Sequence, residues 1–251
     1  MAIRRRAVHA EQEDEGFFVS MTDMMVGMLF LFILMLMFFA LKFNEAAVQI
    51  NRTNEILKSA EETRTEILQD LQRSLKNQGI TVEIDLGNGI LRLPENILFE
   101  RNRSDLTGHG HEAVLVLGRS LGGVLPCYAT IPDEARPNTC ADSPHTVEAI
   151  FVEGHTDSDG DDVLNWNLSV QRGLSTYQAL VDANHKLAQL LNTKSQAILS
   201  VSGYGKQRPV RPNDTAENKR QNRRIDLRFI MTTPKAKPVQ EVEKKVEEQA
   251  R

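Results

Sequence analysis

One segment of the sequence brings together residues that could bind a ligand carrying both charges. The polar turn 156–162 follows a strand-like segment and precedes a helical pattern. In that pattern Asn165, Leu168 and Arg172 are three and four residues apart and therefore share one face of the helix. Asp157 on the turn can face Arg172 across a cleft, where the carboxylate would bind an ammonium group and the guanidinium a carboxylate. A purely structural ion pair between the two residues fits the same spacing.

The same turn is rich in carboxylates, but its spacing argues against an EF-hand calcium site. Asp157, Asp159 and Asp161 match loop positions one, three and five of that motif. Asp162 stands at position six, where the sharp turn needs glycine, and Leu168 stands at position twelve, where a bidentate glutamate belongs. The sequence therefore predicts no calcium site here.

Zinc and hydrolytic sites are also excluded by spacing. His155, His145 and the two cysteines lack the spacing of zinc ligands. A hydrolase using His155 and Asp157 would need a nucleophile, and neither Ser158 nor Ser169 lies in a supporting motif. We predict a protein that is not an enzyme and that has no metal and no cofactor.

A second candidate residue, Asp23, lies within the apolar run 17–43. No charged residue occurs between Met24 and Leu41, and about 20 apolar residues span a bilayer core of roughly 30 Å. A carboxylate inside such a segment is costly and usually faces a partner helix or a wet cavity, which makes Asp23 a candidate ion or proton site. Alternatively, Thr22 and Asp23 cap a shorter helix at the headgroup boundary.

Charges around the apolar run predict its orientation. Arg4, Arg5 and Arg6 precede it, so the positive-inside rule leaves residues 1–16 as a cytoplasmic tail. The rest of the chain is then on the outer side, in the periplasm if the cell has a double envelope. A cleaved signal peptide is the alternative, but the run is too long and no A-x-A-like site follows. The net charge of −4, without a long basic run, argues against a nucleic-acid partner.

Residues 44–79 follow the predicted transmembrane helix and are expected to form a helical stalk. The segment has no proline, and its first glycine is Gly79. Apolar residues recur with a spacing close to a heptad, so the stalk either forms a weak parallel dimer or is a solvated helix. These residues are Ile50, Leu57, Ala60, Ile67 and Leu71.

From residue 80 the pattern alternates between strands and helices. It predicts an α/β domain over 80–233, with a mixed sheet and helices on one face. The tail 234–251 is rich in Lys, Glu, Val and Pro and is predicted to be disordered. The expected strands are 80–86, 90–93, 146–155, 196–205 and 223–231, and the expected helices are 110–124, 165–191 and 215–221.

Several of these segments resemble the OmpA-like peptidoglycan-binding domain over roughly residues 80–231. The matching motifs are FVEGHTDSDG, the following N-x-x-LSxxR, SGYG and NRRIDLRF. The resemblance implies that Asp157 and Arg172 bind the two ends of diaminopimelate in the cell-wall stem peptide. It also implies a cleft lined by Thr156, Asn165 and Leu168. The chain departs from the family in an inserted loop at 125–146.

Both cysteines, Cys127 and Cys140, lie within that insertion. In an oxidising compartment they would form a disulfide, which the chain-entropy model values at roughly 3 kcal/mol. Free thiols are the alternative.

The order of anchor, stalk and OmpA-like domain is similar to that of the MotB family, the B subunits of ion-driven stators. The resemblance implies a homodimer inside a ring of MotA-like A subunits, with Asp23 carrying a translocated H+ or Na+. The Met- and Phe-rich sequence after Asp23, with Gly27 four residues on, resembles the B subunit of Zorya antiphage defence systems. That resemblance implies indirect coupling to cytoplasmic effectors. A flagellar stator subunit, or a passive tether to peptidoglycan in which Asp23 is only a cap, remains an alternative.

Overall fold

The computed structural model describes residues 2–131, 136–138, 140 and 143–233, with side chains from residue 21 onward. The chain divides between Glu55 and Ile56 into two compact units. The predicted disordered tail, 234–251, lies outside the described residues.

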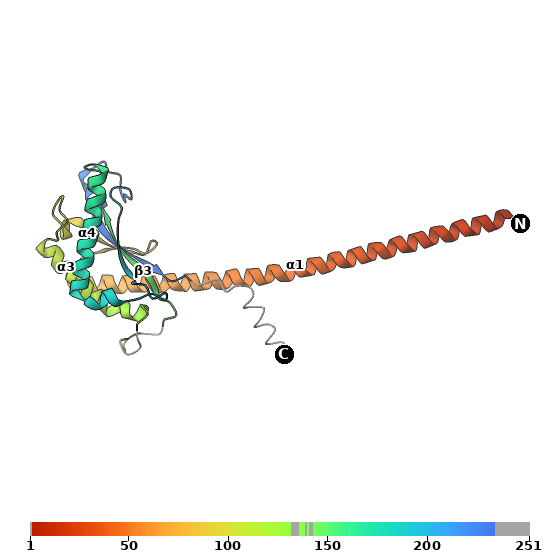
Figure 1. Cartoon of the computed structure of the whole chain (residues 1–251), viewed down its shortest axis with the longest axis horizontal. Helices are drawn as coiled ribbons and strands as arrows, with labels where there is room; N and C mark the ends of the chain where they lie inside the picture. The colour runs from red at the N-terminus through yellow and green to blue at the C-terminus, as the bar shows by residue number, and fades with distance from the viewer. Residues whose placement is uncertain (1, 132–135, 139, 141–142, 234–251) are drawn as a thin grey trace. The chain divides into compact units, whose positions relative to one another are not determined.

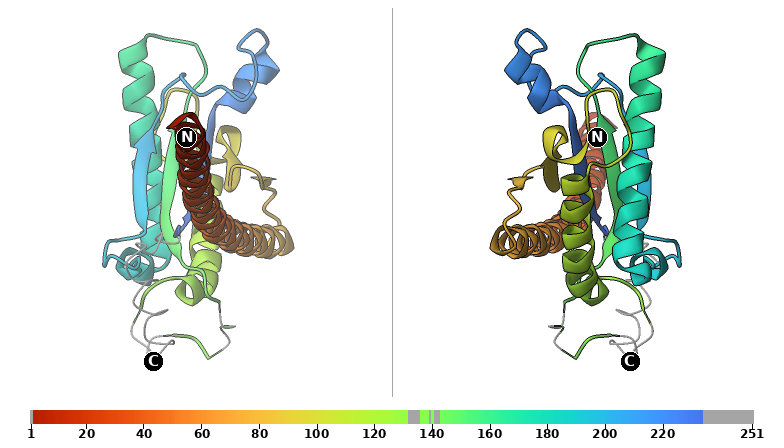
Figure 2. Two further views of the ribbon diagram at one scale, coloured as in Figure 1. Left: turned by 90° about the vertical axis from the view of Figure 1, so that its right-hand side faces the viewer. Right: turned by 90° about the vertical axis from the view of Figure 1, so that its left-hand side faces the viewer.

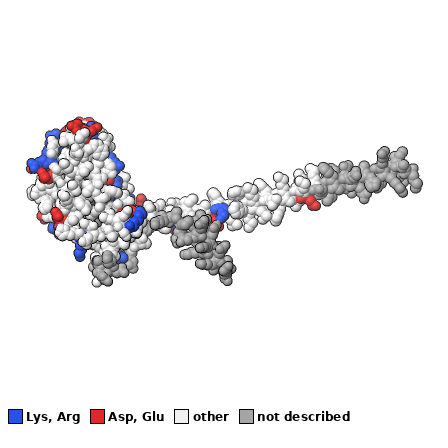
Figure 3. All heavy atoms as spheres, viewed as in Figure 1, with Lys and Arg blue, Asp and Glu red and all other residues white. Residues whose placement is uncertain are grey.

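The first unit is formed by the helix α1 (Ala2–Asn77), which begins here and continues into the second unit. From residue 21 to residue 43 its apolar side chains are exposed, with Met24 76% and Phe43 79% accessible. The charge-free part of this segment is visible in Figure 3. α1 is long and apolar enough to cross a membrane, so the predicted long apolar helix at the N-terminus is confirmed.

The second half of α1 belongs to the core of the globular unit. Five of its apolar residues are buried there: Ala60, Ile67, Leu68, Leu71 and Leu75. Much of the heptad-like pattern therefore reflects packing within one chain, and only Ile50 and Leu57 of the predicted seam remain exposed. The sequence predicts a stalk over all of 44–79, whereas the globular unit begins at Ile56.

Polar contacts hold this half of α1 in place. Arg64 donates from Nη2 to the carbonyl oxygens of Leu86 and Gly87, each at 3.3 Å. Ser74 Oγ lies 2.9 Å from Ser120 Oγ. These bonds join α1 to a hairpin turn on one side and to the helix α3 (Gly108–Val124) on the other.

A mixed sheet of five strands forms the centre of the globular unit, with the order β1-β2-β5-β3-β4. The pairing of β3 with β4 is parallel, and the other pairings are antiparallel. The strands are β1 (Glu83–Asp85), β2 (Ile90–Pro94), β3 (Val147–His155), β4 (Leu199–Gly203) and β5 (Arg224–Met231).

Helices cover one face of this sheet, as predicted. The helices α3 and α4 (Asp162–Ala183) lie side by side on that face (Figures 1 and 2). Short helices precede α3 and β5: α2 (Glu95–Leu98) and α5 (Ala216–Asn222). Two 3₁₀ turns, Leu125–Tyr128 and His185–Gln189, complete the described helices. The fold is therefore an α/β domain that follows a long apolar helix.

The N-terminal half of α4 lies unusually close to the sheet. A Cβ atom on Gly154 of β3 would lie 1.9 Å from the Ser169 carbonyl oxygen, so only glycine fits there. Asp161 caps α4 by accepting a hydrogen bond of 2.7 Å from the Leu164 amide. This close contact fixes the position of the helix relative to the end of β3.

The inserted loop contains the predicted disulfide. Cys127 and Cys140 are joined, with their Cα atoms 5.2 Å apart, so the disulfide is confirmed and the free-thiol alternative is wrong. Near the end of the insertion, His145 Nε2 lies 2.9 Å from Ser59 Oγ on α1. The insertion is thus linked to the helix that enters the domain.

Candidate functional site

Strand pairing brings charged residues from three distant parts of the chain to one end of the sheet. β2 and β5 pair so that Pro94 is opposite Arg224, which places Glu95 beside Arg223. The Glu95 amide donates to the Arg223 carbonyl oxygen at 3.2 Å. His155, the last residue of β3, is also opposite Arg224, so the turn that carries Asp157 begins at the same place.

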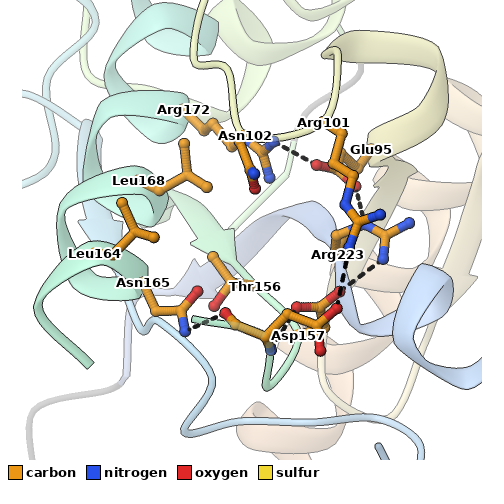
Figure 4. A pocket seen from close by; sticks show the side chains of 11 residues that line it. Glu95, Arg101, Asn102, Thr156, Asp157, Leu164, Asn165, Leu168, Arg172 and Arg223 are labelled. Atoms are coloured by element: carbon orange, nitrogen blue, oxygen red, sulfur yellow. Dashed lines mark hydrogen bonds and ion pairs between the residues drawn. The ribbon is translucent and has the colours of Figure 1, made fainter. Parts of the chain in front are cut away.

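These segments surround a shallow pocket of about 340 Å³, a volume that includes space open to solvent (Figure 4). All five residues predicted to line a cleft do line it: Thr156, Asp157, Asn165, Leu168 and Arg172. Six further residues line the pocket that were not predicted from the sequence: Glu95, Arg101, Asn102, Asp159, Leu164 and Arg223.

Asp157 and Arg172 are on the same pocket but are paired with other residues. Asp157 Oδ2 accepts a hydrogen bond of 2.7 Å from Arg223 Nη1. Arg172 instead contacts the Glu95 carboxylate, and Arg223 contacts the same carboxylate from its other side. These three ion pairs form a row in space, Asp157–Arg223–Glu95–Arg172, in which negative and positive charges alternate. The alternative of a direct ion pair between Asp157 and Arg172 is wrong, because each residue is paired with a different partner.

Arg172 is almost fully buried, and most of its donors are used within the chain. Its Nε donates to the Arg103 carbonyl oxygen at 2.8 Å and its Nη2 to that of Glu100 at 3.2 Å. Burial lowers the pKa of Arg172, and the charge of Glu95 acts in the opposite direction. Nη1 makes no hydrogen bond within the described part of the chain, so it is the donor left for an anionic ligand group.

The remaining pocket residues add one polar and one apolar feature. Thr156 is buried, and its Oγ1 has no hydrogen-bond partner among the described residues. Asn165 Nδ2 donates to the Asp159 carbonyl oxygen at 2.9 Å and so fixes the turn against α4. Leu164 and Leu168 form an apolar wall on the α4 side (Figure 4). The pocket therefore offers both charges, a free hydroxyl and an apolar surface.

The sequence contained a weak signal for the two missed ion-pair partners. Glu95 directly follows β2, and Arg223 directly precedes β5. Each would have been assigned to the site if the antiparallel pairing of these strands had been known. Strand pairing over more than 120 residues is not visible in a local pattern.

A second charged cluster lies on the face of the sheet opposite the helices. Glu153, His155 and Asp226 place ligand atoms within 4.8 Å of one another. Each carboxylate is already paired with arginine: Glu153 with Arg228 at 2.9 Å, and Asp226 with Arg92 and Arg224 at 2.9 Å. Three guanidinium groups would repel a metal ion here, so the cluster is better explained as a structural network.

This network predicts a stability that depends on pH. Burial lowers the pKa of His155 below its ordinary value of 6.5. Folding therefore excludes a proton that the unfolded chain binds, and stability present above pH 6.5 is lost as the pH falls. Burial alone would raise the pKa of Glu153, but His155 and Arg228 lower it to about 2. The stabilisation from Glu153 is then lost between pH 4.5 and 2.

Urea unfolding of the full chain in detergent, followed by the fluorescence of Trp166, measures this dependence. The chain has one tryptophan, so the signal reports on α4 alone. We expect His155→Gln to reduce the loss of stability between pH 7 and pH 5. An identical loss in both proteins would mean that other groups control it.

Comparison with known proteins finds a family match for part of the globular domain. Residues 138–223 match the OmpA family. The Zorya protein ZorB from Escherichia coli is 22% identical over 220 residues, which cover 88% of this chain and 82% of that protein. Motility protein B from Bacillus subtilis is 34% identical over 85 residues, 32% of this chain and 30% of that protein.

A solved structure is also similar. The putative MotB like protein from Desulfovibrio vulgaris has 19% sequence identity and a TM-score of 0.49, and the match covers 71% of this chain and 99% of that one. The relationship to the OmpA family and to motility protein B bears out the prediction that the chain is not an enzyme.

Proposed function

We propose that this chain is the peptidoglycan-anchored B subunit of an ion-driven, stator-type complex in the inner membrane. One observation carries the proposal: the five residues matched to a peptidoglycan-binding motif converge on one pocket with separated charges. The OmpA-like fold and the similarity to motility protein B agree with it.

In the pocket, the ligand would be the zwitterionic end of diaminopimelate in the stem peptide. Asp157 would bind the ammonium group, and Arg172 would bind the carboxylate through the free Nη1. The unpaired hydroxyl of Thr156 would supply a further hydrogen bond. Because the site's own acidic and basic residues already neutralise one another, a ligand with both charges binds without leaving a net charge behind.

The helix α1 would provide the membrane part of the complex. Residues 17–43 would cross the bilayer with residues 1–16 in the cytoplasm, and the domain 80–233 would lie in the periplasm. Two copies would associate through the exposed Ile50 and Leu57 of α1, inside a ring of MotA-like subunits. Asp23 would bind the translocated ion, a proton or a sodium ion, and no nucleic acid would be bound directly.

We place the complex in antiphage defence of the Zorya type, with indirect coupling to cytoplasmic effectors. The similarity to the Escherichia coli Zorya protein supports this, because it extends over most of both chains. The match to motility protein B covers less than a third of each chain. A flagellar stator subunit and a passive peptidoglycan tether are the alternatives.

Sedimentation with purified peptidoglycan sacculi tests the wall-binding part. We expect the full chain in detergent to sediment with the sacculi and Asp157→Asn to stay in the supernatant. Breaking a buried charge contact costs about 2–5 kcal/mol, which is more than tenfold in affinity. Free meso-diaminopimelate should release the wild-type chain.

Asp162→Asn is the matched control. Asp162 is exposed in the first turn of α4, pairs with Lys206 and is outside the pocket. This variant should sediment like the wild type. If Asp157→Asn also sediments with unchanged affinity, the pocket is not the wall-binding site.

A further inference from the structure

Arg101, at the edge of the pocket, keeps most of its hydrogen-bond donors free. It lines the pocket, and its side chain is 75% accessible. Its Nη2 donates to Asp159 Oδ2 at 3.3 Å. Its Nε and Nη1 have no hydrogen-bond partner among the residues that the structure describes. The zwitterionic end of a ligand needs only Asp157 and Arg172, so Arg101 is available for a further group.

The ion-pair partner of Arg101, Asp159, is also held by a second cation. Lys219 Nζ on α5 lies 2.6 Å from Asp159 Oδ1, whereas Arg101 contacts the other carboxylate oxygen. The hydrogen bond from Lys219 is the main reason why the pKa of Asp159 is lowered. Asp159 therefore remains paired when the Arg101 guanidinium turns to a ligand.

These ion pairs leave one surplus positive charge at the pocket. Among the described residues, those that line the pocket and their ion-pair partners comprise three carboxylates and four cations: Glu95, Asp157 and Asp159, with Arg101, Arg172, Arg223 and Lys219. The four charges in the row from Asp157 to Arg172 balance one another. The surplus therefore lies at Asp159, which supplies one negative charge to two cations. A zwitterionic ligand end leaves this surplus in place, whereas one further carboxylate on the ligand neutralises it.

The backbone turn that carries Arg101 is fixed relative to Arg172. The Arg103 amide donates to the Glu100 carbonyl oxygen at 3.1 Å and closes the turn. Asn102 in this turn has a φ of 58°, a left-handed conformation that asparagine adopts more readily than most residues. The carbonyl oxygens of Glu100 and Arg103 both accept hydrogen bonds from Arg172. The main chain therefore holds the base of the Arg101 side chain close to the Arg172 guanidinium.

Arg101 and the apolar wall lie on opposite sides of the pocket (Figure 4). Leu164 and Leu168 line the α4 side, and Arg101 reaches in from the other side. A ligand held in the pocket therefore has an apolar surface on one side and a partly free guanidinium on the other. A peptide that carries a carboxylate beside its bound end fits this arrangement.

We propose, on the basis of the wall-binding function proposed for the pocket, that Arg101 binds a second carboxylate of the stem peptide, outside the zwitterionic end of diaminopimelate. Arg101 is then a specificity-determining residue, because amidation of that carboxylate removes the charge that the guanidinium recognises. Two groups of the stem peptide have this chemistry. One is the α-carboxylate of the glutamate that precedes diaminopimelate, and the other is the carboxylate at the end of the peptide.

Calorimetric titration of the full chain in detergent with synthetic stem peptides tests the proposal. The probe is N-acetyl-L-alanyl-γ-D-glutamyl-meso-diaminopimelyl-D-alanine, prepared with both of these carboxylates free, with either one amidated, or with both amidated. We expect the wild type to bind the doubly amidated peptide about fivefold more weakly than the peptide with both free, the upper range for an exposed ion pair. The two singly amidated peptides identify which carboxylate Arg101 binds.

Arg101→Gln should lose this preference. It should bind all four peptides with the affinity that the wild type has for the doubly amidated one. Arg220→Gln is the matched control, because Arg220 is exposed on α5, pairs with Glu217 and lies outside the pocket. This variant removes the same charge and should keep the fivefold preference. Lys219 is unchanged in both variants and still holds Asp159.

Three results would overturn the role of Arg101 while leaving the wall-binding function intact. The wild type binds all four peptides equally well, Arg101→Gln keeps the preference, or Arg101→Gln no longer binds even the doubly amidated peptide. The last result would mean that Arg101 supports the pocket itself. If the wild type binds none of the peptides, the wall-binding function and the role of Arg101 are both wrong.

Discussion

Replacing Asp23 with asparagine should abolish protection against phage in cells that carry this gene with its native neighbours. Asparagine keeps the size of the side chain and removes its ability to bind and release a proton or a cation. The 18 residues from Met24 to Leu41 carry no charge, so no neighbouring residue of that run can take over the role. Ion flux supplies about 2.3 kcal/mol per charge and 100 mV, and this supply would be lost completely. Plaque counts on the two strains measure the effect.

Glu45→Gln is the matched control for this experiment. Glu45 is an exposed carboxylate on the same helix that pairs with Lys42 just beyond the apolar run, and its loss should leave protection unchanged. Membrane levels of all variants must be equal. If Asp23→Asn protects as well as the wild type, Asp23 is not the ion-carrying residue, and the result favours the passive tether. If the wild type gives no protection, the wild type and Asp23→Asn should be compared in a motility assay, which tests the flagellar alternative.

Replacing Glu95 with alanine should destabilise the globular domain by about 3–5 kcal/mol, the usual effect of removing one partner of a buried ion pair. Glu95 is 4% accessible and contacts both Arg172 and Arg223. Without it, Arg172 is buried with no carboxylate in contact, and Arg223 is left with Asp157 alone. Sedimentation with sacculi should be lost together with stability, because Arg172 and Arg223 lose the carboxylate that holds their positions.

Urea unfolding followed by Trp166 fluorescence measures this change. Glu100→Ala is the control: Glu100 is exposed, and Arg172 binds its backbone carbonyl oxygen, which the substitution keeps. Its effect should remain within about 0.5 kcal/mol. Glu95→Gln, which keeps the size of the side chain and an acceptor oxygen, should fall between the two. Equal stability of Glu95→Ala and Glu100→Ala would show that the carboxylate does not support the arginines.

Much of the fold is encoded in local patterns of the sequence. Patterns within single segments predicted the strands around 90–93, 146–155 and 223–231. The segment 223–231 alternates, because successive side chains of a strand point to opposite faces. Helical spacing predicted α3 and most of α4. The five predicted pocket residues lie within 17 positions of one another, so a turn followed by a helix is enough to place them together.

The ion-pair partners in the pocket depended on contacts distant in sequence. Glu95 and Arg223 are brought together by strand pairing, and each pairs with a residue that sequence analysis expected to face a ligand. Tertiary contacts also assign the two parts of α1 to different units. Residues up to Glu55 belong to the first unit, and residues from Ile56 onward belong to the globular unit. A heptad-like spacing is the same for a helix that packs on its own domain and for one that packs on a second chain.

The sequence by itself determined which segments are helix or strand, where the apolar run and Asp23 lie, and which five residues share the pocket. These properties follow from the periodicity of side chains along one segment of backbone. The tertiary structure alone decided the partners of each charge in the pocket, the extent of α1 within the core and the position of α4 against the sheet. Such features depend on contacts between segments that are separate in the sequence, up to 128 residues apart for Glu95 and Arg223, and no local period specifies such contacts.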